Sequence, residues 1–339
     1  MQFFMKQTIS TLFLAVTIIT ATAQDKLKEA QEYLNVPGGV QNVDKKVLKE
    51  PDPQAFPYIA LKFRTASVQR YITVKGRTAL DKDQVVEAPT YAILSGVDSL
   101  LCQEITNEFT QIFLAKMKET GITIIDFAKV MEGKTYKKFL EEPAERNFND
   151  KDFGTAHVYT NDNMPFFYQG GMKIFKFAQD NEGGAATLRL TVDFVQFETE
   201  GTKTKINAGG EVGYNYTASA LPMIKITSDV YHEGRQLGGP ITTGGLVLGT
   251  KKYLSAQFIQ AKPVTATYEA LTEKYDEKSP KFADKSAFAQ TRGKIFGGQI
   301  QMGTFVLTAN RDAYKKTSLE ALAKYTDYVL EIIKSYREK

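Results

Sequence analysis

The chain has 339 residues, of which 43 are Lys or Arg and 39 are Asp or Glu, and its net charge is only +4. This near balance gives no basis for a nucleic-acid partner, because nucleic-acid binding needs clustered positive charge. Cys102 is the only cysteine, which excludes an internal disulfide and leaves stability to the core or to partners. We expect Cys102 to be a small buried hydrophobe within a helix.

The first 23 residues are predicted to be a secretory signal. One basic residue, Lys6, precedes the uncharged run TISTLFLAVTIIT, and Ala21 and Ala23 occupy the two small-residue positions before a cleavage site. The run is shorter than the roughly 20 residues that span a bilayer as a helix, which disfavours a retained anchor. We therefore expect a bacterial protein that is cleaved after Ala23, is periplasmic or secreted, and has no transmembrane helix in the mature chain.

The remaining residues are expected to form one large domain behind an N-terminal extension. Residues 24–57 contain a helix at 25–34 followed by a linker rich in Pro and Gly. Residues 58–339 form a single α+β domain. Its expected parts are an α/β half at 58–146, a β-rich half at 147–308 and a closing helix at 311–337.

The α/β half combines alternating and helical patterns. Residues 58–77 alternate apolar and polar side chains, which predicts strands. A helix is expected over 91–119, and Gly121 is placed to end it, because glycine accepts the left-handed conformation found just past helix ends. The run 122–127 predicts a central strand, and 128–142 predicts a second helix. The apolar stripe of the first helix consists of Val97, Leu101, Ile105, Phe109, Ile112 and Phe113.

Strand patterns dominate the β-rich half. The Asn- and Asp-rich segment 147–165 is typical of an irregular loop. Gly209, Gly210 and Gly213 predict a flexible connection between strands, because no helix follows them as a phosphate-binding loop would require. The expected strands are 172–178, 186–198, 222–231, 253–260 and 295–308.

The strand pattern over 186–198 changes face along its length. Apolar residues first alternate with Arg189, Thr191 and Asp193, and the alternation then breaks at Val195. A β-bulge at this point would explain the change of face. Alternation of this kind predicts an antiparallel sheet with one face in water.

The closing helix completes the expected fold. Asn310 is its expected N-cap, and apolar residues follow at spacings of three and four. Together these elements predict the fold class α+β: a mixed or mainly antiparallel sheet flanked by helices, with a long C-terminal helix.

No catalytic residue can be assigned from a motif. The two histidines, His157 and His232, lie far apart in the sequence, and neither H-E-x-x-H nor G-x-S-x-G occurs. Without a phosphate-binding loop or a second cysteine, we expect no cofactor and no metal. A hydrolase whose serine, histidine and carboxylate meet only in the fold stays an alternative.

A calcium site is a weaker hypothesis. Asp150, Asp152 and Asp162 offer hard oxygen ligands, although the residues between them break the EF-hand pattern. Asp and Asn also populate turns for local reasons, so a turn is the competing interpretation.

A sugar- or peptide-binding module is another alternative. Phe166, Phe167 and Tyr168 lie in the most aromatic window of the chain and could form a stacking surface. Ordinary core packing of the same rings is the competing interpretation.

The order of elements resembles that of a known family. A helix, a strand and a second helix in LLCQEITNEFTQIFLAKMKETGITIIDFAKVMEG precede paired strands, and NRDAYKKTSLEALAKYTDYVLEII closes the chain. This order resembles the periplasmic domain of the curli-secretion channel family and related cell-envelope assembly proteins, over about 90–200 and the final helix. The resemblance implies a protein that acts in secretion or assembly beside an envelope protein partner.

Two features depart from that family. Its channel members carry a lipid on a cysteine, which this chain lacks near Ala23, and they insert a β-hairpin into the outer membrane. The strand pair 186–198 and 222–231 is comparable with that hairpin, but polar positions such as Arg189 and Lys225 favour a sheet in water. The leading hypothesis is an exported, non-catalytic binding or scaffolding component whose oligomeric state stays open.

Overall fold

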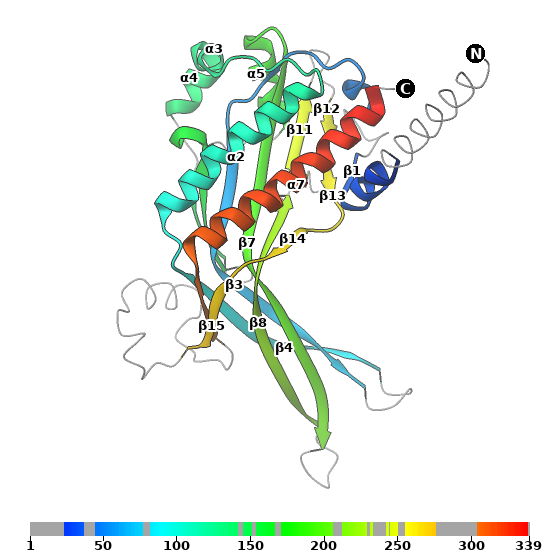
Figure 1. Ribbon diagram of the computed structural model, residues 1–339, viewed down its shortest axis with the longest axis vertical. Coiled ribbons are helices and arrows are strands. Elements are labelled where there is room, and N and C mark those ends of the chain that lie inside the picture. Colours follow the sequence, from blue (N-terminus) through cyan, green and yellow to red (C-terminus); the bar gives the residue numbers. More distant parts are fainter. Residues whose placement is uncertain are drawn as a thin grey trace, which may run out of the picture.

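The fold has two parts, a body in which helices cover a twisted sheet and a set of strands that runs away from the helices (Figure 1). The predicted signal over 1–23 lies outside the described residues. The structure, a computed structural model, describes residues 24–36, 45–76, 82–141, 145–150, 154–166, 171–205, 212–228, 231–232, 242–243, 245–249, 255–275 and 304–337.

Helices and strands are interspersed up to α5, the described elements from β7 to β16 are all strands, and a long helix closes the fold. Residues 24–33 are helical. The other helical elements are η1 (Lys45–Leu48), α2 (Ser99–Glu119), α3 (Phe127–Glu132), α4 (Lys134–Glu141), η2 (Asn161–Asn163), α5 (Gly171–Asp180) and α7 (Arg311–Arg337). The strands are β1 (Leu34–Asn35), β2 (Gln54–Ala55), β3 (Ile59–Lys75), β4 (Gln84–Ser95), β5 (Asn147–Asp150), β6 (Gly154–Thr160), β7 (Gly184–Lys205), β8 (Val212–Ser228), β9 (Tyr231–His232), β10 (Thr242–Thr243), β11 (Gly245–Gly249), β12 (Ser255–Gln257), β13 (Ile259–Gln260), β14 (Val264–Thr267), β15 (Ala270–Lys274) and β16 (Thr304–Ala309).

Two long strands, β3 and β7, organise the sheet because each changes its neighbours along its length. In the body, β3 lies between β6 and β7, while β7 lies between β3 and β11. Farther along, β3 pairs with β4 and β7 pairs with β8. The β3–β7 and β4–β16 pairs are parallel, whereas β3–β4 and β7–β8 are antiparallel. The mixed sheet, the flanking helices and the long α7 confirm the expected α+β fold.

Helices α2 and α7 lie side by side over one face of the sheet (Figure 1). Their apolar stripes meet the same core, in which Phe109, Phe113 and Tyr325 are each 0% exposed. Asn310 caps α7, because its Oδ1 accepts a hydrogen bond from Ala313 N at 3.1 Å, as expected from the sequence. None of the described helices combines the length and the apolar character that crossing a membrane requires.

A second core lies on the opposite face of the body sheet. Along β3, Leu61 belongs to the first core and Ala60 to the second. Arg189 of β7 is the register partner of Ala60, and it is only 5% exposed. The polar face that was expected in water is therefore buried in the body, because the short helices α3, α4 and α5 form a layer beyond it.

One predicted strand is a helix. Residues 172–178 lie within α5, where Phe177 stacks on Phe139 of α4 with ring centroids 5.3 Å apart. A short run of apolar residues fits both the strand period and the helix period, so packing against α4 decides the outcome here.

Two further predictions were wrong for reasons of tertiary pairing. The run 122–127 makes a single bridge, Ile124 with Gln54, instead of a central strand, because α3 begins at Phe127. The segment 147–165, expected as an irregular loop, contains the hairpin β5–β6. Strand β6 forms there because it pairs with the edge of β3.

The N-terminal helical residues 24–33 dock on α7. Tyr33 stacks on Tyr328 with ring centroids 4.6 Å apart, and the Tyr328 hydroxyl donates a hydrogen bond to Glu29 Oε1 at 2.7 Å. Burial, followed by this contact with Glu29, raises the pKa of Tyr328. Strand β1 then pairs with β13, so the extension is part of the body.

Candidate functional site

The feature of the fold that suggests a function is an arm of four strand segments. We define the arm as residues 65–75 and 84–90 of β3 and β4, with residues 194–205 and 212–222 of β7 and β8. It consists of two hairpins that leave the body as the sheet twists (Figure 1). The arm exists because β3 and β7 are 17 and 22 residues long, which exceeds the roughly 3–10 residues of an ordinary strand.

Each outer strand of the arm has one edge that is not paired with any other described strand. Strand β4 pairs with β16 only from Tyr91 onward, and β8 pairs with β14 only from Met223 onward. In the part of the chain that the structure describes, no strand pairs with the outer edge of 84–90 or of 212–221, whereas the Pro222 carbonyl accepts a hydrogen bond from Tyr268 N at 3.3 Å. Such an edge presents backbone N–H and C=O groups to which another strand can pair.

A proline stands near the inner end of each open edge. Pro89 lies two residues before Tyr91, and Pro222 lies directly before Met223. Proline has no backbone N–H to contribute to a ladder, so in sheets it is confined to edges, strand starts and bulges. The prolines therefore separate the part of each edge that pairs within the chain from the part that is open.

Large apolar side chains are exposed on the arm. The exposed fractions are 56% for Tyr71, 71% for Val85 and 37% for Leu221. The β3–β4 register places Tyr71 and Val85 on the same face as diagonal neighbours, whereas Leu221 lies on β8 of the other hairpin. Adjacent exposed apolar side chains such as Tyr71 and Val85 are typical of surfaces that meet another protein.

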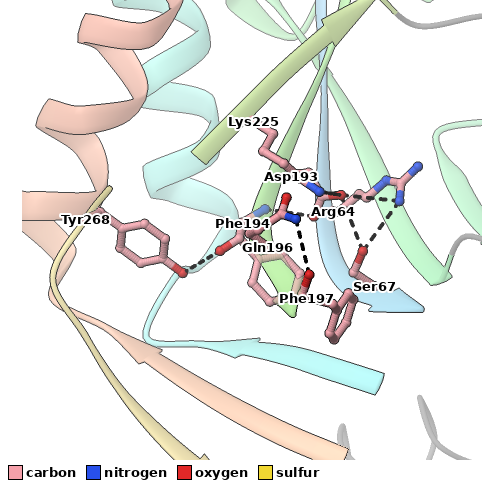
Figure 2. A network of polar contacts seen from close by, with 8 residues as sticks. All are labelled: Arg64, Ser67, Asp193, Phe194, Gln196, Phe197, Lys225 and Tyr268. Atoms are coloured by element: carbon pink, nitrogen blue, oxygen red, sulfur yellow. Dashed lines mark hydrogen bonds and ion pairs between the residues drawn. The ribbon is translucent and has the colours of Figure 1, made fainter. Parts of the chain in front are cut away.

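Four polar side chains meet where the arm leaves the body, and we call them the base cluster: Arg64, Ser67, Asp193 and Lys225 (Figure 2). Asp193 Oδ2 lies 3.4 Å from Arg64 Nη1 and 3.8 Å from Lys225 Nζ, and it accepts a hydrogen bond from Ser67 Oγ at 3.3 Å. The Asp193 side chain is 9% exposed, and those of Arg64 and Lys225 are each 22% exposed. The carboxylate is thus enclosed between cations from the two neighbouring strands.

The base cluster coincides with irregularities in the sheet. The β7–β8 register shifts between Asp193 and Val195, where the alternation predicts a bulge, but the extra residue lies in β8, since Met223 and Ile224 stand opposite Phe194. The β3–β6 register shifts between Arg64 and Ala66, and the body part of the β3–β7 ladder stops at Phe63. Side chains therefore connect three strands where main-chain pairing is interrupted. The role that follows for Asp193 is to hold strands together.

We expect Asp193→Asn to lower the free energy of unfolding by about 1–3 kcal/mol, because Arg64 and Lys225 then face each other without a compensating negative charge. Urea denaturation of the purified chain measures this change. Glu198→Gln is the control, because Glu198 is an exposed residue of the same strand. Equal effects of the two substitutions would contradict a supporting role for Asp193.

The aromatic residues suggested for ligand stacking are only partly described. Phe166 is 1% exposed, and its ring meets that of Tyr58 edge-on at 5.4 Å between centroids. Phe167 and Tyr168 lie outside the described residues, so the stacking surface stays a prediction. Close to Tyr58 is a cavity of about 280 Å³ whose lining is mostly apolar and includes Phe56, Phe127 and Lys118.

The suggested calcium ligands also stay a prediction. Asp162 is exposed in η2 and has a positive φ of 48°, a conformation that Asp tolerates in turns. Asp150 ends β5, where it is the register partner of Gly154, and Asp152 lies outside the described residues. Among the described residues, no group of three or more His, Cys, Asp or Glu is arranged to hold a metal ion.

The residues considered for catalysis form no described triad with a serine and a carboxylate. His157 Nδ1 contacts Asn147 Oδ1, and burial followed by the nearby Arg146 lowers its pKa. The side chain of His232 lies outside the described residues. Cys102 is buried in α2, as expected, and burial raises the pKa of its thiol to about 12, which keeps it protonated and unreactive near neutral pH.

Reasoning from the sequence missed both the arm and the base cluster. The available clue was the length of the alternating patterns, which continue in β3 and β7 well beyond an ordinary strand. The opposite charges of Arg64 and Asp193 carry no signal by themselves, because 129 residues separate them. Comparison of the chain with protein-family models, curated proteins and solved structures found no significant match.

Proposed function

We propose that this chain is an exported, non-catalytic component of the bacterial cell envelope that binds other envelope proteins by strand pairing along its arm. The observation that carries this proposal is the pair of edges, at 85–90 and 212–221, with which no other described strand pairs. The resemblance of the element order to envelope assembly proteins supports the choice of an envelope partner.

Strand addition suits the arm because an open edge supplies binding groups from the main chain. An extended segment that pairs with such an edge gains a ladder of backbone hydrogen bonds, and side-chain contacts give it specificity. Val85 and Leu221 are placed to supply such contacts, because they are exposed on the outer strands β4 and β8, and exposed Tyr71 lies diagonally beside Val85 on β3. Burying them would add to the affinity in proportion to the apolar area removed from water.

Site-directed crosslinking tests the proposal. Thr217→Cys places a thiol on the open edge of β8, and Lys129→Cys places a matched thiol on exposed α3. Native Cys102 is buried, so a thiol-linked photo-crosslinker reacts with the introduced residue alone. In intact envelopes, we expect a discrete product with another envelope protein from Thr217→Cys and none from Lys129→Cys.

A second substitution makes the test specific for the edge. Ser219→Lys, added to Thr217→Cys, should remove the product, because a lysine on an edge strand opposes pairing with another strand. Equal products from the edge and α3 positions, or a product that Ser219→Lys leaves unchanged, would reject strand pairing. A product that contains only lipid would indicate a membrane surface and would equally overturn the proposed protein partner.

A further inference from the structure

We propose that the two hairpins of the arm can separate, and that the arm opens like a fork between β3 and β7. We define the fork as residues 64–73 of β3 and 193–200 of β7. A role for this opening in binding rests on the proposed function. Separation of the hairpins would expose the inner edges of β3 and β7 to a partner strand, in addition to the outer edges of β4 and β8.

The first observation is an interruption of the β3–β7 ladder. Ile59–Phe63 pairs with Leu188–Val192, and pairing resumes only at Val74 with Gly201 and Lys75 with Thr202. Between these two regions the strands face each other across the fork without register partners. Main-chain pairing therefore holds the two hairpins together at the ends of the fork, but not along it.

The second observation is that side chains replace the missing ladder, at distances near the upper limit for hydrogen bonds. At the base, Arg64 and Ser67 contact Asp193 at 3.4 and 3.3 Å. Within the fork, Gln69 Nε2 lies 3.4 Å from Thr199 Oγ1. Ordinary N–H···O bonds are about 2.7–3.2 Å long, so these contacts are longer than those of a ladder and fewer residues of the fork take part in them.

The third observation is a small latch at the far end of the fork, which we define as Val74, Gly201 and the contact between Lys203 and Lys82. Val74 is 0% exposed and packs against Gly201, where an added Cβ would lie only 2.8 Å from Val74 Cγ2. Lys203 Nζ donates a hydrogen bond to the Lys82 carbonyl oxygen at 3.2 Å. Closure thus depends on the absence of a side chain at position 201.

Each hairpin is held more firmly than the fork. The β7–β8 ladder continues without a shift from Val195–Pro222 to Lys205–Val212, and the β3–β4 ladder is continuous from Tyr71 to Val74. Separation of the hairpins therefore breaks the latch, the side-chain contacts across the fork and the packing of buried Ile72 beside Gly201, while both hairpin ladders stay intact. Because the β3–β4 and β7–β8 ladders are more continuous than the β3–β7 ladder, we expect the arm to open between β3 and β7.

Hydrogen exchange with a reversible crosslink tests the fork. Val74→Cys with Gly201→Cys joins register partners on neighbouring strands, at a spacing that a disulfide can bridge. Thr73→Cys with Val85→Cys is the matched control, because these residues are register partners within the β3–β4 hairpin. Oxidation of the first pair is expected to slow amide exchange in 193–200 by about tenfold or more, and reduction should restore it. Oxidation of the control pair should leave exchange in 193–200 unchanged.

A third variant covers the case in which the disulfide fails to form. Gly201→Ala places a Cβ against Val74, so it should open the latch and accelerate exchange in both segments of the fork. The inference is overturned if fork amides in the unmodified chain exchange as slowly as the hairpin ladders and neither oxidation nor Gly201→Ala changes them. Crosslinking from Thr217→Cys is a separate measurement, so failure of the fork and failure of the proposed strand pairing are distinguishable.

Discussion

Gly154→Ala is expected to lower the free energy of unfolding by about 2–5 kcal/mol, which combines backbone strain with overpacking. Gly154 begins β6 with a φ of +95°, a conformation that residues with a side chain rarely adopt. A Cβ at this position would lie 2.1 Å from the Ala66 carbonyl oxygen and 2.7 Å from its carbon. These atoms belong to the main chain of β3, so relief of the clash requires movement of the sheet next to the base cluster.

Gly121→Ala separates the two contributions to this cost. Gly121 also has a positive φ, +76°, but a Cβ there would meet the guanidinium end of Arg337, a flexible side chain that can move away. Its expected cost is therefore only about 1 kcal/mol, from backbone strain alone. Chemical denaturation of both variants measures the difference, and equal costs would show that contact with Ala66 adds nothing.

Phe113→Ala is expected to cost about 3–5 kcal/mol, the usual range for removal of a large aromatic ring from a core. Phe113 is 0% exposed in α2, and its ring meets Phe56 at 5.7 Å and Phe109 at 5.9 Å between centroids. Its removal leaves a cavity between α2 and the segment that leads into β3. The surrounding residues can fill such a space only partially.

Leu100→Ala is the matched control for Phe113→Ala. Leu100 lies in the same helix, but its side chain is 74% exposed. We expect this change to alter the free energy of unfolding by less than about 0.5 kcal/mol, as is usual at exposed positions. Similar midpoints of urea denaturation for the two variants would contradict the assignment of Phe113 to the core between α2 and the sheet.

Elements with a long and unambiguous pattern were predicted well. The stripe of α2 supplies the expected buried residues, among them Phe109 and Phe113, and Asn310 caps α7 as expected. The break in alternation at Val195 of β7 correctly located a register shift of the β7–β8 ladder, although the extra residue lies in β8. These features are local, because a helix period, a cap or a strand bulge leaves its mark within a few adjacent residues.

Elements that depend on distant neighbours were predicted poorly. Helix α5 was expected as a strand, because the position of Phe177 against Phe139 is set by packing that the sequence does not display. The N-terminal part of the predicted helix 91–119 belongs to β4, whose residues pair with β3 and β16. The hairpin β5–β6 likewise requires the edge of β3. Tertiary pairing overrides local preference in each case.

The arm could not be predicted from the sequence for a similar physical reason. Alternation reveals that β3 and β7 are strands, but it does not reveal where each strand exchanges one neighbour for another. The base cluster forms only when that exchange brings Arg64, Asp193 and Lys225 together from three strands. The burial of Arg189 was missed because the second layer of helices is specified elsewhere in the chain.

The docking of residues 24–33 on α7 has a consequence for the order of events during folding. Tyr33 stacks on Tyr328, and the Tyr328 hydroxyl donates a hydrogen bond to Glu29, so these contacts join segments that lie far apart in the sequence. Contacts of such long sequence separation form slowly, because the chain between them must first be brought together. We therefore expect the N-terminal helix to be secured only after α7 has packed on the sheet.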